Sequence, residues 1–310
     1  MKYLLIYNPN SGTKRDNERL LQGVKELIEK EGHTAELRET KAEGHATRIA
    51  REAVKSDVDV IVAVGGDGTV NEIGHALTGS DKVLGIIPNG SGNGLARELR
   101  IPMNAKAATS TLLRHHVTTI DTCEANGECF FVTCGIGLDG MISEEFADSD
   151  TRGPATYVKE TVSLLLNYKP SDYLITIDGR EVTATAYLVA VANASQYGNN
   201  AFIAPNASMS DGMLDVTIMK PFSEIDAAKI ALQLFTKEID KSDYTSMYRG
   251  RDIVITSSQP VPYHIDGEPK KAVSRLEVKV HSKKLRVIAG SDEDRDKNIV
   301  ELFQSIIGAR

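Results

Sequence analysis

The sequence lacks the features that identify several common classes of protein. It contains no run of about 20 apolar residues, so a transmembrane helix is excluded and any membrane contact must be peripheral. Near the N-terminus, one Lys precedes a short apolar run that ends at Asn8-Pro9, which is too short for the core of a signal peptide. We therefore expect a cytoplasmic protein.

Positive charge and cysteine are also scarce. The chain has 36 Lys and Arg residues against 43 Asp and Glu residues, and its net charge of -7 has the wrong sign for a protein that holds nucleic acid by its phosphates. The three cysteines, Cys123, Cys129 and Cys134, lack the paired CxxC spacing of a zinc site or a redox motif. We expect no nucleic-acid partner, no disulfide and no cysteine-bound metal.

The first third of the chain alternates short Val- and Ile-rich runs with longer runs of helical period. The expected strands are Tyr3–Tyr7, Thr34–Arg38, Val58–Val64 and Lys82–Ile87, and the expected helices include Asn17–Lys30 and Ala46–Val54. Apolar runs with little polar alternation are typical of parallel strands that crossover helices cover on both faces. The length of 310 residues favours two domains. We assign residues 1–122 to the first, an α/β domain with a parallel sheet.

Beyond residue 122 the pattern changes to pairs of short strands with Gly at the turns, which is typical of an antiparallel sheet. We assign residues 123–291 to a mainly antiparallel β domain. Its expected strands include Tyr173–Ile177, Val182–Val191, Asp252–Thr256 and Arg275–Ala289, and its expected helices are Ala155–Tyr168 and Glu224–Thr236. Residues 292–310 contain an amphipathic helix, Asp294–Ile307, which we expect to return to the first domain.

Three polar glycine loops follow expected strands of the first domain: Asn8–Gly12, Gly65–Thr69 and Pro88–Gly94. The carboxyl ends of parallel strands meet at one edge of a sheet, so the loops should converge there on a nucleotide. Glycine lets the backbone approach a polyphosphate, and a following helix N-terminus favours the negative charge. Asp67 is placed to hold Mg²⁺ through water. For Gly65–Thr69 alone, a plain turn with an acidic N-cap explains the pattern equally well.

Two familiar nucleotide motifs do not account for these loops. The P-loop pattern GxxxxGK[ST] does not occur in the sequence. A GxGxxG pattern does occur at Gly135, Gly137 and Gly140, but no second strand with a terminal acidic residue follows at the spacing of a dinucleotide site. We interpret this motif as a decoy.

The chain resembles the lipid kinases with a diacylglycerol kinase catalytic domain, a family that includes sphingosine and ceramide kinases. Five blocks carry the resemblance in the family order: Gly65–Thr69; Gly90–Asn93 with Leu95-Ala96-Arg97 and Ile101-Pro102; Gly135–Asp139; Ala204-Pro205 with Asp211–Asp215; and Asp266–Pro269. The resemblance implies a nucleotide domain similar to that of phosphofructokinase, then a β-sandwich domain, with the active site between them. It also implies ATP and Mg²⁺ as cofactors.

The resemblance assigns roles to individual residues. Nucleotide contacts are expected from Asn8, Asn10, Ser11, Gly12, Thr40, Gly65, Gly66, Asp67, Gly68, Thr69, Glu72, Gly90, Ser91 and Asn93. Catalytic carboxylates are expected at Asp67, Asp139, Asp266 and Glu268, and a structural Mg²⁺ at Ser208, Asp211 and Met213. Two alternatives stay open, because Asp266-Gly267 also suits a hairpin turn and Asp139 also suits a helix N-cap. If Asp266 and Glu268 instead lie in an extended strand, they should point the same way.

The implied partner is a membrane lipid, reached by peripheral contact at the inner face of the membrane. Gly94 follows Asn93 at a position where diacylglycerol kinases usually have Asp. Asn199-Asn200-Ala201 stands where a glycine run is frequent in the family. The acceptor is therefore left open among diacylglycerol, a sphingoid base, ceramide, phosphatidylglycerol and polyprenol. The oligomeric state is also open, a homodimer included.

Other interpretations compete with this one. A kinase of the same fold could act on a soluble substrate, as NAD kinase and phosphofructokinase do, or the chain could be a nucleotide-binding regulator without turnover. The apolar stripe of Tyr157–Tyr168 could line an acyl-chain pocket, but we favour a place in the core. His45 and His264 lie beside motifs of the family, yet no group of histidines has metal-ligand spacing. We interpret both as packed or surface polar residues.

Overall fold

The computed structural model describes residues 1–11, 14–148, 168–291 and 294. The chain forms two units, one of residues 1–120 together with the segment that begins at Lys284, and one of residues 121–283. The sequence-based boundary was placed at residue 122, and the returning segment at residue 292. Gly12, the helix expected before Tyr168 and most of the expected C-terminal helix lie outside the described residues. Within the described part of the chain, no helix is both long enough and apolar enough to cross a bilayer.

The first unit contains a parallel sheet. Its strands are β1 (Lys2–Tyr7), β2 (Thr34–Glu39), β3 (Val60–Gly65) and β4 (Val83–Pro88), in the spatial order β2-β1-β3-β4. The last residues of β14 (Glu268–Ile288) pair in parallel with the start of β4. β3 and β4 are buried along their whole length, as expected for strands covered on both faces. The predicted parallel α/β fold is therefore confirmed.

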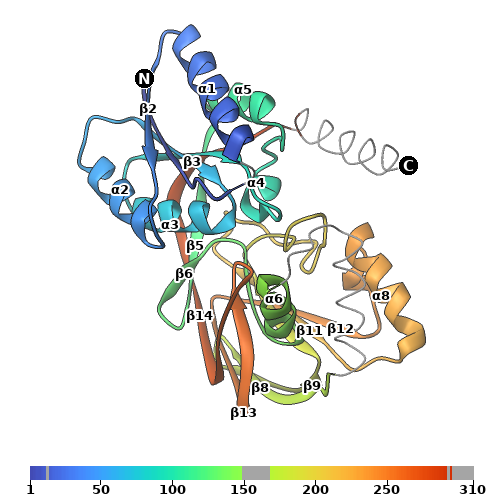
Figure 1. Ribbon diagram of the computed structural model, residues 1–310. Coiled ribbons are helices and arrows are strands. Elements are labelled where there is room, and N and C mark those ends of the chain that lie inside the picture. Colours follow the sequence, from blue (N-terminus) through green and yellow to red (C-terminus); the bar gives the residue numbers. More distant parts are fainter. Residues whose placement is uncertain (12–13, 149–167, 292–293, 295–310) are drawn as a thin grey trace. The chain divides into compact units, whose positions relative to one another are not determined.

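Helices cover the two faces of this sheet (Figure 1). α1 (Lys14–Lys30) packs against α5 (Ala105–Arg114), and α2 (His45–Val54) packs against α3 (Asp67–Leu77). The short α4 (Gly94–Glu98) follows β4. In α2 the buried residues are Ala46, Ile49, Ala50 and Ala53, which is the spacing of one helix face. The C-terminal segment reaches the same unit, where Asp294 forms an ion pair with Arg114 of α5.

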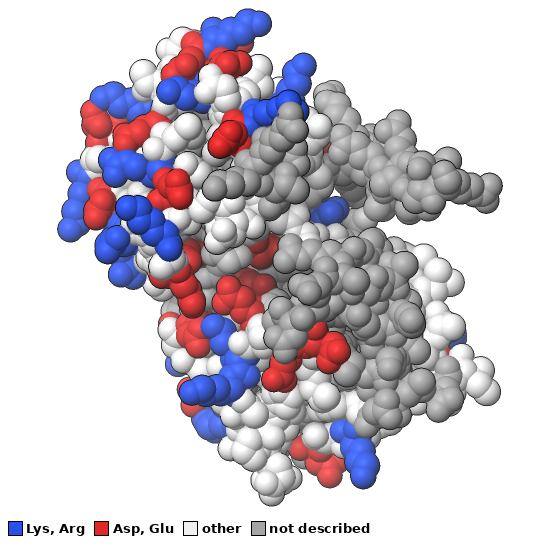
Figure 2. All heavy atoms as spheres, in the orientation of Figure 1, with Lys and Arg blue, Asp and Glu red and all other residues white. Residues whose placement is uncertain are grey.

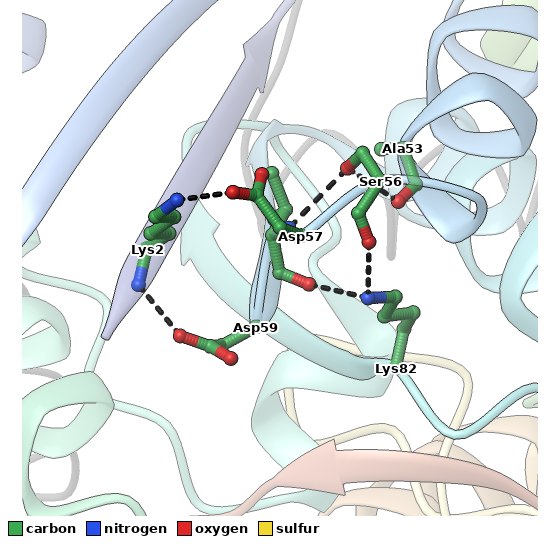
Figure 3. A network of polar contacts seen from close by, with 7 residues as sticks. Lys2, Ala53, Ser56, Asp57, Asp59 and Lys82 are labelled. Atoms are coloured by element: carbon green, nitrogen blue, oxygen red, sulfur yellow. Dashed lines mark hydrogen bonds and ion pairs between the residues drawn. The ribbon is translucent and has the colours of Figure 1, made fainter.

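A polar network fixes the starts of the strands in the first unit (Figure 3). The backbone N–H of Lys2 donates to Asp59 at 2.7 Å, and the Lys2 side chain forms an ion pair with Asp57. Lys82 donates to two carbonyl groups of the segment before β3, at 2.8 and 2.7 Å. These side chains lie at the amino edge of the sheet. The exposed ion pair adds little stability there, whereas the hydrogen bonds of Asp59 and Lys82 to backbone groups hold the strand starts together.

The second unit is mainly antiparallel. Its elements are β5 (Val117–Ala125), β6 (Glu128–Phe130), β7 (Thr133–Gly137), α6 (Leu138–Asp148), β8 (Ser171–Ile177), β9 (Arg180–Ala186), β10 (Leu188–Ala192), β11 (Leu214–Met219), α8 (Glu224–Thr236), the 3₁₀ helix η1 (Ile239–Lys241), β12 (Thr245–Gly250), β13 (Asp252–Ile265) and most of β14. The spatial order is β12-β11-β10-β7-β13-β14, and β8 pairs with β13 and β9. The predicted β-sandwich domain is confirmed, and α8 has the predicted bounds.

Alternation along the strands builds two cores in this unit. Val189 and Val191 of β10 enter one buried cluster, whereas Leu188, Ala190 and Ala192 enter a second cluster with residues of α6 and α8. Successive residues of β10 thus serve opposite faces of the sheet. β13 pairs with β8 up to Ser257 and with β7 from Tyr263 onward. Between these two stretches its pairing with β14 shifts register. One strand thus links two layers of the sandwich.

One expected strand is divided in the structure. The sequence suggested a single strand over Val182–Val191, but β9 ends at Ala186 and β10 begins at Leu188. Ala186 pairs with Ser171 of β8, whereas Leu188 pairs with Gly137 of β7. The sequence suggested one strand because its run of β-forming residues is continuous. The division at Tyr187 arises because the strand pairs with β8 before this residue and with β7 after it.

The three cysteines are free thiols. Cys123 and Cys134 are buried in the first of the two core clusters of the sandwich. Burial raises the pKa of both thiols well above the usual value. These side chains therefore behave as small apolar core residues.

Candidate active site

The polar glycine loops follow neighbouring strands. Tyr7 at the end of β1 pairs with Val64 of β3, and Gly65 at the end of β3 pairs with Pro88 of β4. From β1 the chain goes to β2 on one side, and it then passes to β3 on the other side. The carboxyl edge between β1 and β3 is thus a topological switch point, where ligands bind in open α/β sheets.

The loops after β3 and β4 are in direct backbone contact. A Cβ atom on Gly90 would lie 2.5 Å from the Cα atom of Gly66, so only glycine fits there. The Asp67 carboxylate bridges the same two loops. Its Oδ2 accepts the backbone N–H of Asn93 at 2.8 Å, and its Oδ1 accepts that of Gly94 at 2.7 Å. Asp67 therefore sets the conformation of the second loop.

Amide side chains attach the loop after β1 to the other two. Asn89 donates to the Asn17 side chain at 2.7 Å and to the carbonyl group of Ser11 at 3.2 Å. Within the first loop, the Asn8 side chain accepts the backbone N–H of Asn10 at 2.9 Å. Asn17 and Asn89 were not among the predicted site residues. Their role depends on contacts between distant segments, which local sequence patterns do not report.

The N-terminus of α3 lies at the centre of these loops. Its N-cap residue is Gly66, and no side chain caps the first turn. Uncapped N–H groups at a helix N-terminus form a favourable site for a phosphate group. Thr69 is buried beneath Gly65, since a Cβ atom at residue 65 would lie 2.7 Å from the Thr69 hydroxyl oxygen. The geometry suits a phosphate that approaches backbone rather than side chains.

Asp67 and Arg97 form the charged centre of this cluster. Burial raises the pKa of Asp67, although the N–H groups of Gly94 and Asn93 and the Arg97 guanidinium act in the opposite direction. Burial lowers the pKa of Arg97, whose Nε donates to the Gly92 carbonyl group at 3.0 Å. Because the ionised carboxylate is poorly solvated, an added cation would stabilise it. Arg97 belongs to a family motif but was not predicted as a site residue.

Several of the predicted nucleotide contacts already have protein partners. The Glu72 carboxylate accepts the backbone N–H of Thr47 at 3.1 Å, which ties α3 to α2. Thr40 is buried directly after β2, and its backbone N–H donates to Tyr7 at 2.9 Å. Ser91 is exposed in the loop before α4. Glu72 thus has a structural partner, whereas Ser91 is accessible.

The second unit contains a buried acidic cluster at the start of α6. The helix begins at Leu138, so Asp139 lies in its first turn, not at the N-cap position considered from sequence. Asp139 is 5% exposed, and its Oδ2 accepts the Tyr197 hydroxyl group at 2.8 Å. His264 Nε2 lies 3.1 Å from the same oxygen. Tyr197 was not predicted as a site residue, and His264 was interpreted as a packed or surface residue.

Asp266 and Gly267 form a two-residue hairpin turn. Ile265 pairs with Glu268 across the turn, and the φ angles of 47° at Asp266 and 82° at Gly267 are both left-handed. This is the geometry of a type I′ turn. The turn alternative is therefore correct, and the extended arrangement that would point Asp266 and Glu268 the same way is wrong.

The two carboxylates of this motif have different surroundings. Asp266 accepts three backbone N–H groups, from Phe131 and Val132 at 2.9 Å and from Thr133 at 3.0 Å. It thereby holds the segment that enters β7. Glu268 has an exposed carboxylate that lies 3.6 Å from the Lys270 ammonium group. Asp266 is thus occupied by backbone groups of the protein, whereas the Glu268 carboxylate is open to solvent.

The glycines of the GxGxxG pattern make room for protein atoms. A Cβ atom at Gly135 would lie 1.9 Å from Asp139 Oδ2, and one at Gly137 would lie 2.5 Å from the Tyr187 carbonyl oxygen. At Gly140 it would lie 2.4 Å from the Pro262 backbone. Close packing accounts for each glycine, in agreement with the interpretation of this motif as a decoy.

The loop expected to hold a structural Mg²⁺ contains an ion pair. Asp211 pairs with Arg249 of β12 through Oδ2, and its Oδ1 accepts the Met213 N–H at 3.0 Å. The same guanidinium lies 3.4 Å from Asp215, which is buried. Arg249 therefore already balances the charge of Asp211, which argues against a Mg²⁺ ion at the predicted set of Ser208, Asp211 and Met213.

A further carboxylate supports this loop. Asp121 is fully buried and accepts the backbone N–H of Gly212 at 2.7 Å and that of Lys283 at 2.6 Å. Sequence reasoning missed it, because its partners Gly212 and Lys283 lie 91 and 162 residues further along the chain.

Comparisons with known proteins agree with the two-unit architecture. Residues 2–125 match the model of the diacylglycerol kinase catalytic domain. Residues 132–289 match the YegS C-terminal NAD kinase beta sandwich-like domain. A diacylglycerol kinase of Bacillus subtilis (strain 168) is 28% identical over 272 residues, which cover 85% of this chain and 88% of that protein.

Solved structures show the same fold. The crystal structure of a diacylglycerol kinase from Bacillus anthracis str. Sterne superposes with a TM-score of 0.71 at 24% identity, over 94% of this chain and 97% of that chain. An NAD kinase from Archaeoglobus fulgidus, solved in complex with ATP, gives a TM-score of 0.52 at 15% identity, over 97% and 98% of the two chains. At these identities the likeness concerns the fold alone.

The Asp211–Arg249 ion pair predicts that stability does not depend on Mg²⁺. The urea midpoint of unfolding should be the same with EDTA as with Mg²⁺. Arg249→Gln should lower the free energy of unfolding by about 1–3 kcal/mol, because buried Asp215 loses its nearby positive charge. Arg251→Gln, two residues along the chain, is the matched control. A midpoint that falls when EDTA is added to the parent protein would contradict the ion-pair interpretation and support a metal at Asp211.

Proposed function

The chain belongs to the lipid kinase family that combines a diacylglycerol kinase catalytic domain with this β-sandwich domain, and we propose that it is an ATP- and Mg²⁺-dependent kinase of a membrane lipid. The acceptor is the hydroxyl group of diacylglycerol or a related lipid. The observation that carries this proposal is the uncapped N-terminus of α3 at the switch point of the parallel sheet, with the Asp67 carboxylate in its first turn. Phosphoryl transfer needs this combination of fixed N–H groups and metal-binding oxygen.

In this proposal the first unit binds the triphosphate. The N–H groups at the start of α3 and the glycine backbone of the neighbouring loops contact phosphate oxygens. Asp67 would hold Mg²⁺ through water, since burial leaves its carboxylate poorly solvated, and a cation beside it would stabilise the charged form. When bound there, Mg²⁺ would supply positive charge against the transferring phosphoryl group. Arg97 supplies a second positive charge near Asp67.

The second unit supplies the carboxylates on the acceptor side. Asp266 is engaged with three backbone N–H groups and acts as a structural clamp. Asp139 and Glu268 each retain an oxygen that can receive the acceptor hydroxyl group or its proton. We therefore assign the acceptor chemistry to Asp139 and Glu268.

Gly94 bears on the choice of lipid. It is buried at the first position of α4, and its N–H group donates to Asp67. A carboxylate at residue 94 would stand close to that of Asp67 and would raise the proton affinity of both groups. Its absence leaves room for a different head group, so we include sphingoid, ceramide-like and other lipid alcohols beside diacylglycerol as acceptors.

We predict that labelled phosphate passes from ATP to at least one member of a panel of diacylglycerol, sphingoid base, ceramide, polyprenol and phosphatidylglycerol, and only with Mg²⁺. Asp67→Asn should lower this turnover at least ~10²-fold, because charge stabilisation at the phosphates is lost. Asp59→Asn, at the opposite edge of the same sheet, is the control and should stay active. Transfer only to NAD or a sugar phosphate would make the chain a kinase of a soluble substrate. ATP binding without any transfer would make it a regulator.

The contrast between Asp266 and Glu268 gives a second prediction. Asp266→Asn should lower the free energy of unfolding by about 1–3 kcal/mol, because the amide cannot accept all three N–H groups. Glu268→Gln should leave unfolding unchanged and lower kcat about 10²-fold, with little change in the KM for ATP. Glu128→Gln removes the other carboxylate beside Lys270 and is the matched control. Parental kcat in Glu268→Gln would remove this residue from the chemistry.

Peripheral membrane contact is part of the proposal, because the acceptor lies in a bilayer. On the face shown in Figure 2, Lys and Arg are interspersed with Asp and Glu over the first unit, so no broad basic surface for anionic lipid is visible there. Apolar contact is the better candidate. Ile225 and Leu232 of α8 are 90% and 63% exposed and lie two turns apart on one helix face.

We predict that the double substitution Ile225→Ser with Leu232→Ser lowers co-sedimentation with acceptor-containing vesicles at least ~10-fold, since each side chain loses apolar surface to bury. High salt should have little effect on the parent protein. Turnover of a detergent-solubilised acceptor should be unchanged. Leu174→Ser, an exposed apolar position on β8, is the control. Equal vesicle binding by the double variant and the parent would exclude α8 as the contact surface.

A further inference from the structure

A buried histidine lies against the Asp139 carboxylate. His264, near the end of β13, is 1% exposed. Its two ring nitrogens have different neighbours: the Gly267 N–H donates to Nδ1 at 3.2 Å, and Nε2 lies 3.1 Å from Asp139 Oδ2. One imidazole thus connects the start of α6 with the hairpin turn that precedes Glu268.

The neighbours of the ring determine its tautomer. A backbone N–H can only donate, so Nδ1 of His264 must accept and carries no proton. The neutral ring then has its proton on Nε2, the nitrogen that faces Asp139. The Nε2–H bond is not aligned with the carboxylate oxygen in the structure. The contact is therefore electrostatic, and a small rotation of the ring or of the carboxylate makes it a hydrogen bond.

Tyr197 holds the same carboxylate oxygen from another direction. Its hydroxyl group lies 2.8 Å from Asp139 Oδ2, and its ring stands edge-on to that of His264 with 6.1 Å between centroids. Oδ2 therefore accepts one hydrogen bond, from Tyr197, and has the polar Nε2 of His264 as a second neighbour. In the described part of the chain, no donor is found for the other oxygen, Oδ1. The two oxygens of this buried carboxylate thus have different surroundings: Oδ2 contacts Tyr197 and His264, and Oδ1 contacts neither.

The backbone leaves space for this arrangement. Gly135 of β7 pairs with His264 of β13 across the sheet. A Cβ atom at residue 135 would lie 1.9 Å from Asp139 Oδ2. Any side chain there would displace the carboxylate from Tyr197 and His264. Four segments, from α6, β7, β13 and the loop after β10, therefore combine to fix one oxygen atom.

We propose that His264 is a positioning residue for the lipid phosphorylation: with Tyr197 it holds Oδ2 of Asp139, so that Oδ1 is presented to the acceptor hydroxyl group. This inference rests on the proposed function. In the transfer, the hydroxyl oxygen bonds to the γ-phosphorus, and the bond from this phosphorus to the β,γ-bridging oxygen breaks. ADP leaves with the bond electrons. The hydroxyl proton passes to Asp139 Oδ1 and then to water.

The connection to Gly267 gives His264 a second effect. Glu268 follows this glycine directly, so the same ring links the position of the turn to that of Asp139. Displacement of the ring should affect both acceptor-side carboxylates together. ATP binding, which the proposal assigns to the other unit, should be insensitive to the ring.

Two amide substitutions separate the roles of the ring nitrogens. The amide nitrogen of His264→Gln reaches the position of Nε2, whereas the amide of His264→Asn reaches only that of Nδ1. We expect His264→Gln to keep kcat within about 5-fold of the parent and His264→Asn to lower kcat about 10²-fold, with the KM for ATP unchanged in both. Tyr197→Phe should lower kcat about 10-fold, since the contact with His264 remains.

Three results from these variants would overturn the proposal. Equal kcat in the Gln and Asn variants, at equal thermal midpoints, would overturn the role of Nε2. A rise in the KM for ATP with unchanged kcat would also overturn the proposal, because the ring would then act on nucleotide binding. If His264→Asn does not fold, Tyr197→Phe decides the matter: parental kcat in that variant would show that Oδ2 need not be held.

A measurement without turnover tests the contact itself. Nitrogen-15 NMR of the histidine rings, with His264→Gln to assign the signal, should show His264 as the neutral Nε2–H tautomer, and Asp139→Asn should shift its Nε2 resonance. An Nδ1–H tautomer would overturn the arrangement. The ring measurement decides the contact whether or not a lipid is phosphorylated. If the parent phosphorylates no lipid, the proposed function fails, and the role in transfer fails with it.

Discussion

The bridge that Asp67 makes between two glycine loops is the contact on which the proposed nucleotide site depends. Gly66 and Gly90 meet backbone to backbone, so no side chain can enter between them. The N–H groups of Asn93 and Gly94, at the start of α4, would otherwise lack acceptors in a buried position. Asp67 supplies both acceptors at the cost of desolvating its own charge, which raises its pKa. A Mg²⁺ ion would relieve that cost, so structure and proposed chemistry share one carboxylate.

Carboxylates that accept several backbone N–H groups also occur in the second unit, where their role is structural. Asp266 accepts three N–H groups and Asp121 accepts two, and both thereby fix loops around the sandwich. A carboxylate whose oxygens are taken up in this way is a poor base, because a proton on it would break the bonds to its donors. Asp139 differs, since the Tyr197 hydroxyl group and Nε2 of His264 both face one of its two oxygens. In the proposed function, this difference is why Asp139 is assigned the acceptor chemistry and Asp266 and Asp121 are not.

Local patterns in the sequence were sufficient for most of the fold. The parallel strands and α8 follow from apolar runs and helical period, and the loops converge because neighbouring parallel strands end at one edge. The patterns were insufficient wherever a residue acts on a distant segment. Arg249 reaches Asp211 from another strand, and His264 reaches Asp139 from across the sheet. Hydrophobic period and composition describe only residues that are close in the sequence. The partners Arg249 and His264 could therefore not be inferred from them.

The Asp-Gly pairs of the second unit show why a motif alone does not identify a site. Asp178-Gly179 has the same φ angles as Asp266-Gly267, 47° and 82°, and forms the same two-residue turn between paired strands. Asp178 also accepts two backbone N–H groups, both at 2.9 Å. The turn and its carboxylate clamp are thus a way of building a hairpin. The later turn differs in its flanks, because His264 precedes it with a contact to Asp139 and Glu268 follows it. Chemistry at this motif should therefore depend on the flanking residues more than on Asp266.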